Sequence, residues 1–288
     1  MTTRNNSDRI GAQATVDTPA PNTPTEDTES TPFQFVTPTE FVELPSQGKY
    51  YPEGHPLHNK ETVEIRFMTA KDEDILSSTT LLKKGLAIER MLKNVIVDKS
   101  INTSDLLVGD KNAILVAARI TGFGSEYCPK ITCPVCGAHT ELEFDLSDAT
   151  LKQGGTSETF SIEMQENNNF TVSLPLSKAA VEVRLLKSSD ERKLMSLLNQ
   201  RKKQKTDQTT LLTDQLKMTI VSVNGETDRN AINGFIAAVP ALDSRYLREA
   251  LADVAPSIDL KQDFTCSSCD YEQELEVPFT ADFFWPRR

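Results

Sequence analysis

The sequence predicts an α+β protein, with two related, mainly helical lobes bridged by a four-cysteine zinc ribbon and preceded by a disordered tail. Three observations predict this class. Two Cys-x-x-Cys pairs lie far apart in the chain, and a Glu-Leu-Glu run follows each at the same distance. The order of strand and helix patterns ahead of the first pair recurs ahead of the second. The first residues are polar and acidic, with few large apolar side chains.

The predicted tail covers residues 1–39, which are rich in Thr, Asn, Pro, Asp and Glu. A segment of this composition cannot bury enough apolar surface to offset the entropy lost on ordering. We therefore expect it to be disordered in the isolated protein. It lacks the apolar stretch of a signal peptide. No apolar run in the chain reaches transmembrane length, so we expect no membrane insertion.

The remaining chain is long enough for one large or two small domains. We expect a first lobe at 40–150 and a second at 151–288, each carrying one cysteine pair. The stretch at 151–157, which contains Gly154 and Gly155, has the composition of a flexible connection. Two alternating segments at 159–164 and 170–174 predict a hairpin that turns across three asparagines.

The two lobes show the same features in the same order. Each has an alternating strand, then a helix-start signal, then further helical segments of which the last is preceded by Asp, and then a cysteine pair. Four features in one order are hard to obtain by chance and indicate a divergent duplication. The alternative is convergent strand and cap patterning. The matched features are the strands at 63–68 and 181–186, Thr69 with Asp72 and Ser188 with Glu191, the segments 92–97 and 216–221, and the helices after Asp110 and Asp243.

The two cysteine pairs predict a zinc site formed by Cys133, Cys136, Cys266 and Cys269. Two such pairs supply four thiolates, which close a tetrahedral site of the ribbon type. A small ribbon buries few side chains, so the metal would supply much of its folding free energy. The expected unit is two knuckles, each opening into a strand, on one shared Zn²⁺.

Other readings of the cysteines are redox motifs, disulfides or accidental spacing. A redox pair stands at a helix N-terminus, whereas each pair here precedes a strand pattern. Disulfides need an oxidising compartment. Cys128 and His139 are spare ligands. Since four cysteines already close the site, we expect Cys128 to be a buried or half-buried thiol.

Composition and motifs oppose catalysis and nucleic-acid binding. The chain has three histidines and no phosphate-binding or metallopeptidase motif. We expect His55 and His58 to form an exposed pair without a function, and we expect no enzyme and no small-molecule substrate. The net charge of −11 argues against nucleic-acid binding, because that binding depends on lysine and arginine side chains that neutralise the phosphates. A zinc-ribbon regulatory protein that binds nucleic acid or a polymerase is the alternative, but acidic residues flank both knuckles.

One ordered set of segments is similar to a known family. The set consists of Glu-Leu-Pro-Ser-Gln-Gly-Lys-Tyr-Tyr-Pro at 43–52, then 63–76, 106–115 and 124–127, and the first cysteine pair. It covers roughly residues 40–145 and resembles the baseplate hub protein family of T4-like contractile-tailed phages. The resemblance implies a non-enzymatic structural or assembly role in the tail baseplate of the virion, assembly in the host cytoplasm, and other baseplate or tail hub proteins as partners.

The C-terminal segment combines aromatic side chains with an arginine tip. Phe283, Phe284 and Trp285 lie in a stretch that is too short and too rich in proline to form its own core. Aromatic and arginine side chains dominate interface hot spots, so these three residues are predicted to bind a partner. The alternative is that they fold back and close the core of the second lobe.

Overall fold

The computed structural model describes residues 36–204, 210–276 and 281–284. Residues 37–288 form one compact unit, which contains every element described below. The tail predicted over 1–39 lies outside the described residues except for its last four, and the final one, Thr39, already begins the first strand. No helix in the described part of the chain is long and apolar enough to cross a membrane.

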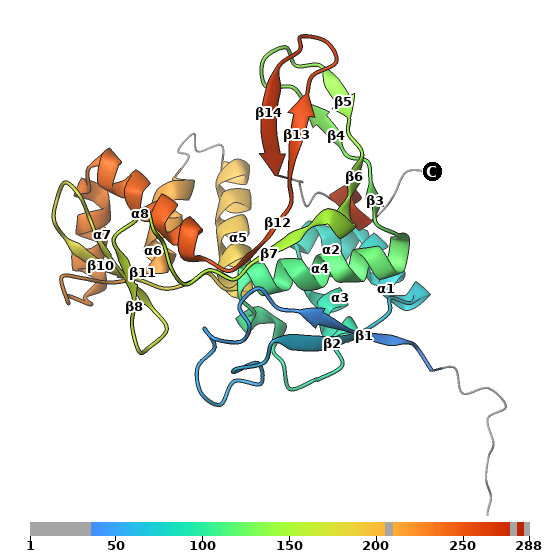
Figure 1. Cartoon of the computed structure of the whole chain (residues 1–288), viewed down its shortest axis with the longest axis horizontal. Helices are drawn as coiled ribbons and strands as arrows, with labels where there is room; N and C mark the ends of the chain where they lie inside the picture. Colours follow the sequence, from blue (N-terminus) through green and yellow to red (C-terminus); the bar gives the residue numbers. More distant parts are fainter. Residues whose placement is uncertain (1–35, 205–209, 277–280, 285–288) are drawn as a thin grey trace, which may run out of the picture. The chain divides into compact units, whose positions relative to one another are not determined.

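The fold is a mixture of helices and short strands, as the α+β prediction required (Figure 1). The first half of the compact unit begins with a hairpin, continues through helices and ends in four short strands, a 3₁₀ turn and one further strand. Its elements are β1 (Thr39–Glu43), β2 (Thr62–Arg66), α1 (Ala70–Ser77), α2 (Thr79–Lys84), α3 (Ala87–Val95), η1 (Thr103–Asp105), α4 (Val108–Phe123), β3 (Glu126–Tyr127), β4 (Lys130–Thr132), β5 (His139–Glu141), β6 (Phe144–Asp145), η2 (Leu146–Asp148) and β7 (Thr150–Lys152).

The second half begins with three strands, alternates helices with a fourth strand, and ends in strands and a 3₁₀ turn. Its elements are β8 (Ile162–Met164), β9 (Phe170–Ser173), β10 (Ala180–Val183), α5 (Ser188–Gln204), α6 (Leu211–Thr219), β11 (Ile220–Val223), α7 (Arg229–Ala238), α8 (Ala241–Val254), β12 (Ser257–Asp259), β13 (Lys261–Thr265), β14 (Glu272–Glu276) and η3 (Ala281–Phe284).

The strands form small antiparallel sheets rather than one large sheet. The largest has the order β11-β10-β9-β8, and the other described sheets are two-stranded. Strands β8 and β9 pair as the predicted hairpin, with Met164 opposite Phe170. Strand β7 of the first half pairs with β12 of the second, so the two halves share a sheet.

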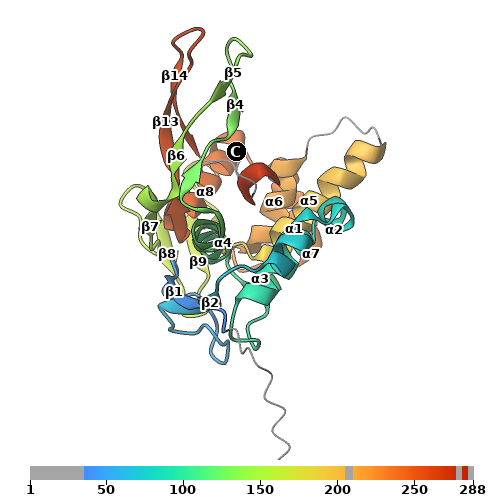
Figure 2. The same ribbon diagram turned by 90° about the vertical axis from the view of Figure 1, so that its right-hand side faces the viewer.

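One apolar core runs through both halves. It contains Leu44 and Ile114 from the first half together with Val181 and Val254 from the second. Helix α4 contacts elements of both halves, including β1, α5 and β12 (Figures 1 and 2). Helix α4 ends at Phe123, and Gly124 follows with a φ of 86°, which favours glycine.

A buried carboxylate fixes the start of α1. Asp72 accepts a backbone hydrogen bond from Thr69 at 2.9 Å, and Arg66 donates to both of its oxygens at 2.7 and 2.9 Å. Burial by itself would raise the pKa of Asp72, but the bonds from Arg66 and Thr69 outweigh it and lower the pKa to about 2. The sequence therefore located this helix start correctly.

The second half repeats this arrangement one residue away from the predicted position. Asp190, rather than Glu191, accepts from the backbone of Lys187 at 3.1 Å and from Arg184 at 2.7 Å. The prediction that Ser188 and Glu191 mark the start of this helix was wrong. Ser188 already lies in the helix, and Glu191 instead pairs with Lys111 of α4. The spacing from arginine to aspartate is six residues in both halves.

Asp110 and Asp243 also occupy matching positions, although neither precedes its helix as expected. Each lies in the first turn, because α4 and α8 begin two residues earlier. Asp110 accepts from the backbone of Ser46 at 2.9 Å, and Asp243 accepts from the backbone of Ser177 at 2.7 Å. Each carboxylate therefore holds the loop that follows an earlier strand against the start of a helix.

Further matching contacts join a helix end to a strand. The residue after α3, Ile96, bridges Ile65 of β2. The residue after α6, Ile220, pairs with Val183 of β10. Contacts of this kind are what a duplication would leave in both copies. The arrangement as two lobes remains a prediction.

Replacing Asp72 by Asn is expected to lower the free energy of unfolding by about 3 kcal/mol at pH 7, because Arg66 loses its buried counter-charge. The folded-state pKa of Asp72 lies below its unfolded value, so its contribution is present above about pH 4 and is lost as the pH falls towards 2. Urea unfolding of the variant and the wild type between pH 3 and 7 tests this.

The control for this change is Glu249→Gln, which breaks an exposed pair with Arg245 on α8. It should alter stability by less than about 0.5 kcal/mol. A constant stability difference between wild type and Asp72→Asn across this pH range would contradict the argument.

Candidate metal centre

Each cysteine pair lies at the turn of a β-hairpin. Strand β4 leads into Cys133 and β5 leads away, with Thr132 opposite His139. The amide of Cys133 donates to Ala138 O at 2.8 Å, and the amide of Gly137 donates to Cys133 O at 3.0 Å. These two bonds fold the intervening residues into a tight knuckle.

The second pair has the same backbone pattern at the same offsets. Strand β13 leads into Cys266, whose amide donates to Tyr271 O at 2.8 Å, and Asp270 donates to Cys266 O at 3.0 Å. The residue two positions before the outgoing strand has a positive φ in both knuckles, at Gly137 and Asp270. The sequence predicted the knuckles and the strands after them, but it did not predict that a strand also precedes each pair.

The four cysteine sulfurs converge between the two hairpins, which lie side by side in Figures 1 and 2. All four sulfurs lie within 4.8 Å of one another. Across the hairpins, Cys133 Sγ lies 3.8 Å from Cys269 Sγ, and Cys136 Sγ lies 3.6 Å from Cys266 Sγ. Tetrahedral Zn–S bonds of about 2.3 Å place neighbouring sulfurs about 3.8 Å apart. The cluster can therefore hold a metal ion of zinc size.

The first cysteine of each pair is buried and the second is exposed. Cys133 and Cys266 pack with Phe264 in a small apolar cluster separate from the main core. The amide of Ser268 lies 3.4 Å from the Cys266 sulfur, and its hydrogen bond lowers the pKa of that thiol. A thiolate is the form that binds metal, so this amide favours coordination.

The two spare ligands lie outside the cluster. Cys128 is exposed rather than buried or half-buried, because Glu126 and Lys130 point outwards with it while Tyr127 and Pro129 point inwards. Burial and then the carboxylates of Glu143, Glu126 and Glu141 raise the pKa of this thiol. His139 is also exposed and bonds Thr132 at 3.0 Å across its hairpin.

His55 and His58 are half-buried, which corrects the prediction of an exposed pair. The ring of His55 stacks on Tyr51 with centroids 4.4 Å apart. His58 Nδ1 lies 2.7 Å from Tyr51 O. His55 therefore packs against the buried Tyr51 side chain, and His58 bonds the Tyr51 backbone.

Tyr51 anchors the loop after β1 onto α4. Its hydroxyl donates to Asp110 at 2.7 Å and accepts from the Leu107 amide at 3.0 Å. Ser46 donates its hydroxyl to the same carboxylate at 2.6 Å. Burial raises the pKa of Asp110 despite these bonds. The sequence analysis named Asp110 only as a signal ahead of a helix and did not predict its bonds to Tyr51 and Ser46.

The C-terminal aromatic residues pack on the first half of the compact unit rather than on the second. Phe283 and Phe284 are 1% and 3% exposed. The Phe283 ring makes an edge contact with Tyr127, and its carbonyl oxygen accepts from Arg119 Nε at 2.6 Å. Both phenylalanines therefore belong to the core, as the alternative expected, but the contacts of Phe283 are with the first half and not with the second lobe. Trp285 lies outside the described residues, and partner binding by the three remains a prediction.

Arg119 is a fully buried residue that the sequence did not single out. Besides Phe283 O, its guanidinium donates to Gly124 O, and to Glu126 O at 2.7 Å. It therefore ties the end of α4 to β3 and η3. The available signal was an arginine within the apolar run at 113–120.

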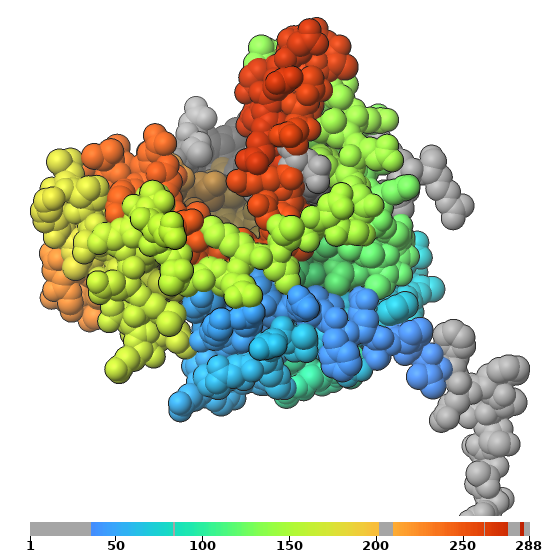
Figure 3. All heavy atoms as spheres, viewed as in Figure 1, coloured from blue at the N-terminus to red at the C-terminus, as the bar shows by residue number. Residues whose placement is uncertain are grey.

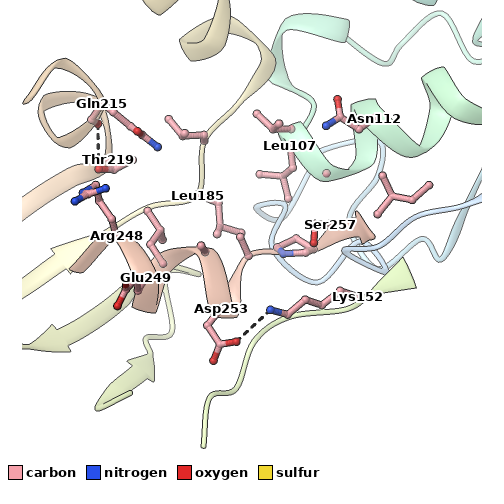
Figure 4. A pocket seen from close by; sticks show the side chains of 18 of the residues that line it. Leu107, Asn112, Lys152, Leu185, Gln215, Thr219, Arg248, Glu249, Asp253 and Ser257 are labelled. Carbon is pink, nitrogen blue, oxygen red and sulfur yellow. Dashed lines mark hydrogen bonds and ion pairs between the residues drawn. The ribbon is translucent and has the colours of Figure 1, made fainter. Parts of the chain in front are cut away.

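A pocket of about 650 Å³ lies beside the starts of α4 and β12 and against α6 and α8 (Figure 4). Leu107 and Leu185 are among its apolar lining residues. Lys152 and Asp253 form an ion pair of 3.1 Å at its edge. The pocket is separate from the metal centre, because none of the four cysteines lines it.

The fold and the cluster define a class: a mixed α+β protein whose cysteine hairpins form a candidate four-thiolate metal centre. A family model for the T4 bacteriophage base plate protein matches residues 37–285, and the chain belongs to that family. The match spans both cysteine pairs and confirms the resemblance detected in the sequence. No curated protein and no solved structure gives a significant match.

The purified protein is expected to contain one zinc per chain, measured by elemental analysis. Cys266→Ser should lose the metal and lower the melting temperature, because it removes a ligand from one hairpin and releases the other. Cys128→Ser is the matched control, since it changes a cysteine outside the cluster. It should keep the zinc content and the melting temperature of the wild type. A metal-free wild-type chain with an unchanged melting temperature would refute the site.

Deleting residues 281–288 is expected to lower the free energy of unfolding by about 3 kcal/mol or more, because two buried phenylalanines and a carbonyl acceptor for Arg119 are lost. Urea unfolding measures the loss, and deletion of 286–288 is the control. Unchanged stability together with failure to enter hub complexes would instead support partner binding by Phe283, Phe284 and Trp285.

Proposed function

We propose that the protein is a non-enzymatic structural or assembly component of the phage tail baseplate hub, held together by a structural zinc ion. The observation that carries the proposal is the family match over residues 37–285, which includes both cysteine hairpins. A baseplate component acts by contact with its neighbours. The partners are therefore other baseplate and tail hub proteins, joined during assembly in the host cytoplasm.

The proposed metal has a structural role. Cys133, Cys136, Cys266 and Cys269 would fill all four positions of a tetrahedral ion, which leaves no position for a reactive water. The hairpins share a small apolar cluster of their own, so coordination would supply much of the energy that holds them together. In this proposal one ion joins two related lobes, 40–150 and 151–288, each of which contributes one knuckle.

The surface charge of the hairpins favours a protein partner over nucleic acid. Glu141 and Glu274 are exposed on the two outgoing strands, and each pairs with a single lysine, Lys130 or Lys261. The chain as a whole carries −11. Phosphate contacts require clustered cations on the binding face, and these strands present carboxylates instead.

Loss of the gene should prevent the formation of baseplates with a complete hub, as seen by electron microscopy of tail intermediates. Complementation with Cys128→Ser should restore the hubs, whereas Cys266→Ser should not. Mass spectrometry of purified hub intermediates and particles should detect the protein in at least one of them. Complete hubs in the absence of the gene would refute the proposal.

A further inference from the structure

Strand β1 has one edge that pairs with no described strand. Its pairing with β2 is fixed by bonds from Leu44 N to Glu61 O at 2.8 Å and from Phe67 N to Pro38 O at 2.9 Å. In an antiparallel pair, alternate residues direct both backbone groups towards the partner. Residues 38, 40, 42 and 44 therefore face β2, and the backbone groups of Thr39, Phe41 and Glu43 point away from it.

These outward groups form a free segment of sheet edge. Within the described part of the chain, no hydrogen bond uses the amides or carbonyls of Thr39, Phe41 or Glu43. The other side of β2 is covered, since Val97 N donates to Glu64 O at 3.0 Å. An uncovered row of donors and acceptors is a template for another strand.

The side chains at this edge favour a binding surface over a protected edge. Phe41 is 70% exposed, although it is a large aromatic residue on a regular strand. The blue atoms around β1 lie at the surface of the face shown in Figure 3. Proteins protect free edges with charged residues, proline, bulges or short strands. Strand β1 contains no lysine, proline or bulge, and its charged residues are Glu40 and Glu43, which repel an acidic strand and attract a basic one.

The charge around the edge is negative and unpaired. Glu40, Glu43 and Glu64 form no ion pair with any described residue, and Glu64 stands directly opposite Phe41. Glu40 Oε1 is buried without a hydrogen-bond partner, and burial raises the pKa of this carboxyl. A buried acceptor without a donor calls for one from outside the chain.

We propose that the free edge of β1 binds an extended segment of a partner protein that carries basic and apolar residues. The segment adds a strand antiparallel to β1, bonded to Thr39, Phe41 and Glu43. It places an apolar side chain beside Phe41 and cations beside Glu40 and Glu43. A second copy of this chain fits less well, since it supplies no cation: paired antiparallel about Phe41, it sets Val42 opposite Glu40 and Thr39 opposite Glu43.

A labelled peptide tests the proposal on the zinc-loaded full chain by fluorescence polarisation. The probe, Lys-Val-Ile-Lys-Thr, sets Lys opposite Glu43, Ile opposite Phe41 and Lys opposite Glu40. A peptide with Glu for both Lys, and one N-methylated at Ile, should each bind at least about tenfold more weakly, because they lose the charge match and a ladder hydrogen bond.

Variants of the protein locate the binding surface. Phe41→Thr and the double change Glu40→Gln with Glu43→Gln should each weaken peptide binding at least about fivefold. Met164→Thr is the matched control, because Met164 is 53% exposed on β8, the edge strand of another sheet, and it should not change binding.

Two results would overturn the proposal. One is equal binding of the three peptides, or binding unaffected by the β1 variants. The other is a wild-type dimer in light scattering that Phe41→Thr converts to a monomer, which would assign the edge to a second copy of the chain.

Discussion

The convergence of four sulfurs is the constraint on which the rest of the architecture depends. Cys133 and Cys269 are 136 positions apart, yet their sulfurs lie 3.8 Å apart. The hairpins that carry them have only a small apolar cluster of their own, separate from the main core. Because apolar burial there is small, the position of the two hairpins relative to one another depends on the sulfur cluster, and a bound metal would hold the hairpin β4–β5 from the middle of the chain against the hairpin β13–β14.

Inside the main core, buried aspartates hold separate segments of the chain against one another. Asp72 and Asp190 each hold a helix start to the strand before it through an arginine, while Asp110 and Asp243 each hold a loop to a helix. Every one of these carboxylates has backbone or cationic partners, which offsets the cost of removing a charge from water. Removing one partner would leave an unpaired buried charge, so these helix starts are rigid supports for the elements that follow.

A strand that is anchored to the core and has one unpaired edge suits a protein that acts by contact with other proteins. Helix α4 receives Tyr51 and Ser46 at its start and Phe283 at its end, so segments from both chain ends meet on it. Strand β1 continues into the loop anchored by Ser46, which fixes its direction and leaves its outer edge free. In the role proposed for this member of a baseplate family, such an edge would supply backbone hydrogen bonds to a neighbouring protein, separately from the cysteine cluster.

The sequence by itself determined which four cysteines cluster, the α+β class, the β8–β9 hairpin and the cap at Asp72, because each depends on spacing within a few residues or on one repeated pattern. The tertiary structure decided the contacts of those residues whose partners lie in other segments of the chain. It shifted the second cap to Asp190, since Arg184 and Lys187 converge there. It directed Asp110 to Ser46 and Tyr51, 64 and 59 positions away. It exposed Cys128 and buried Arg119 against three carbonyl groups. Local periodicity cannot encode these outcomes, because each depends on which distant donor or acceptor arrives when the core closes.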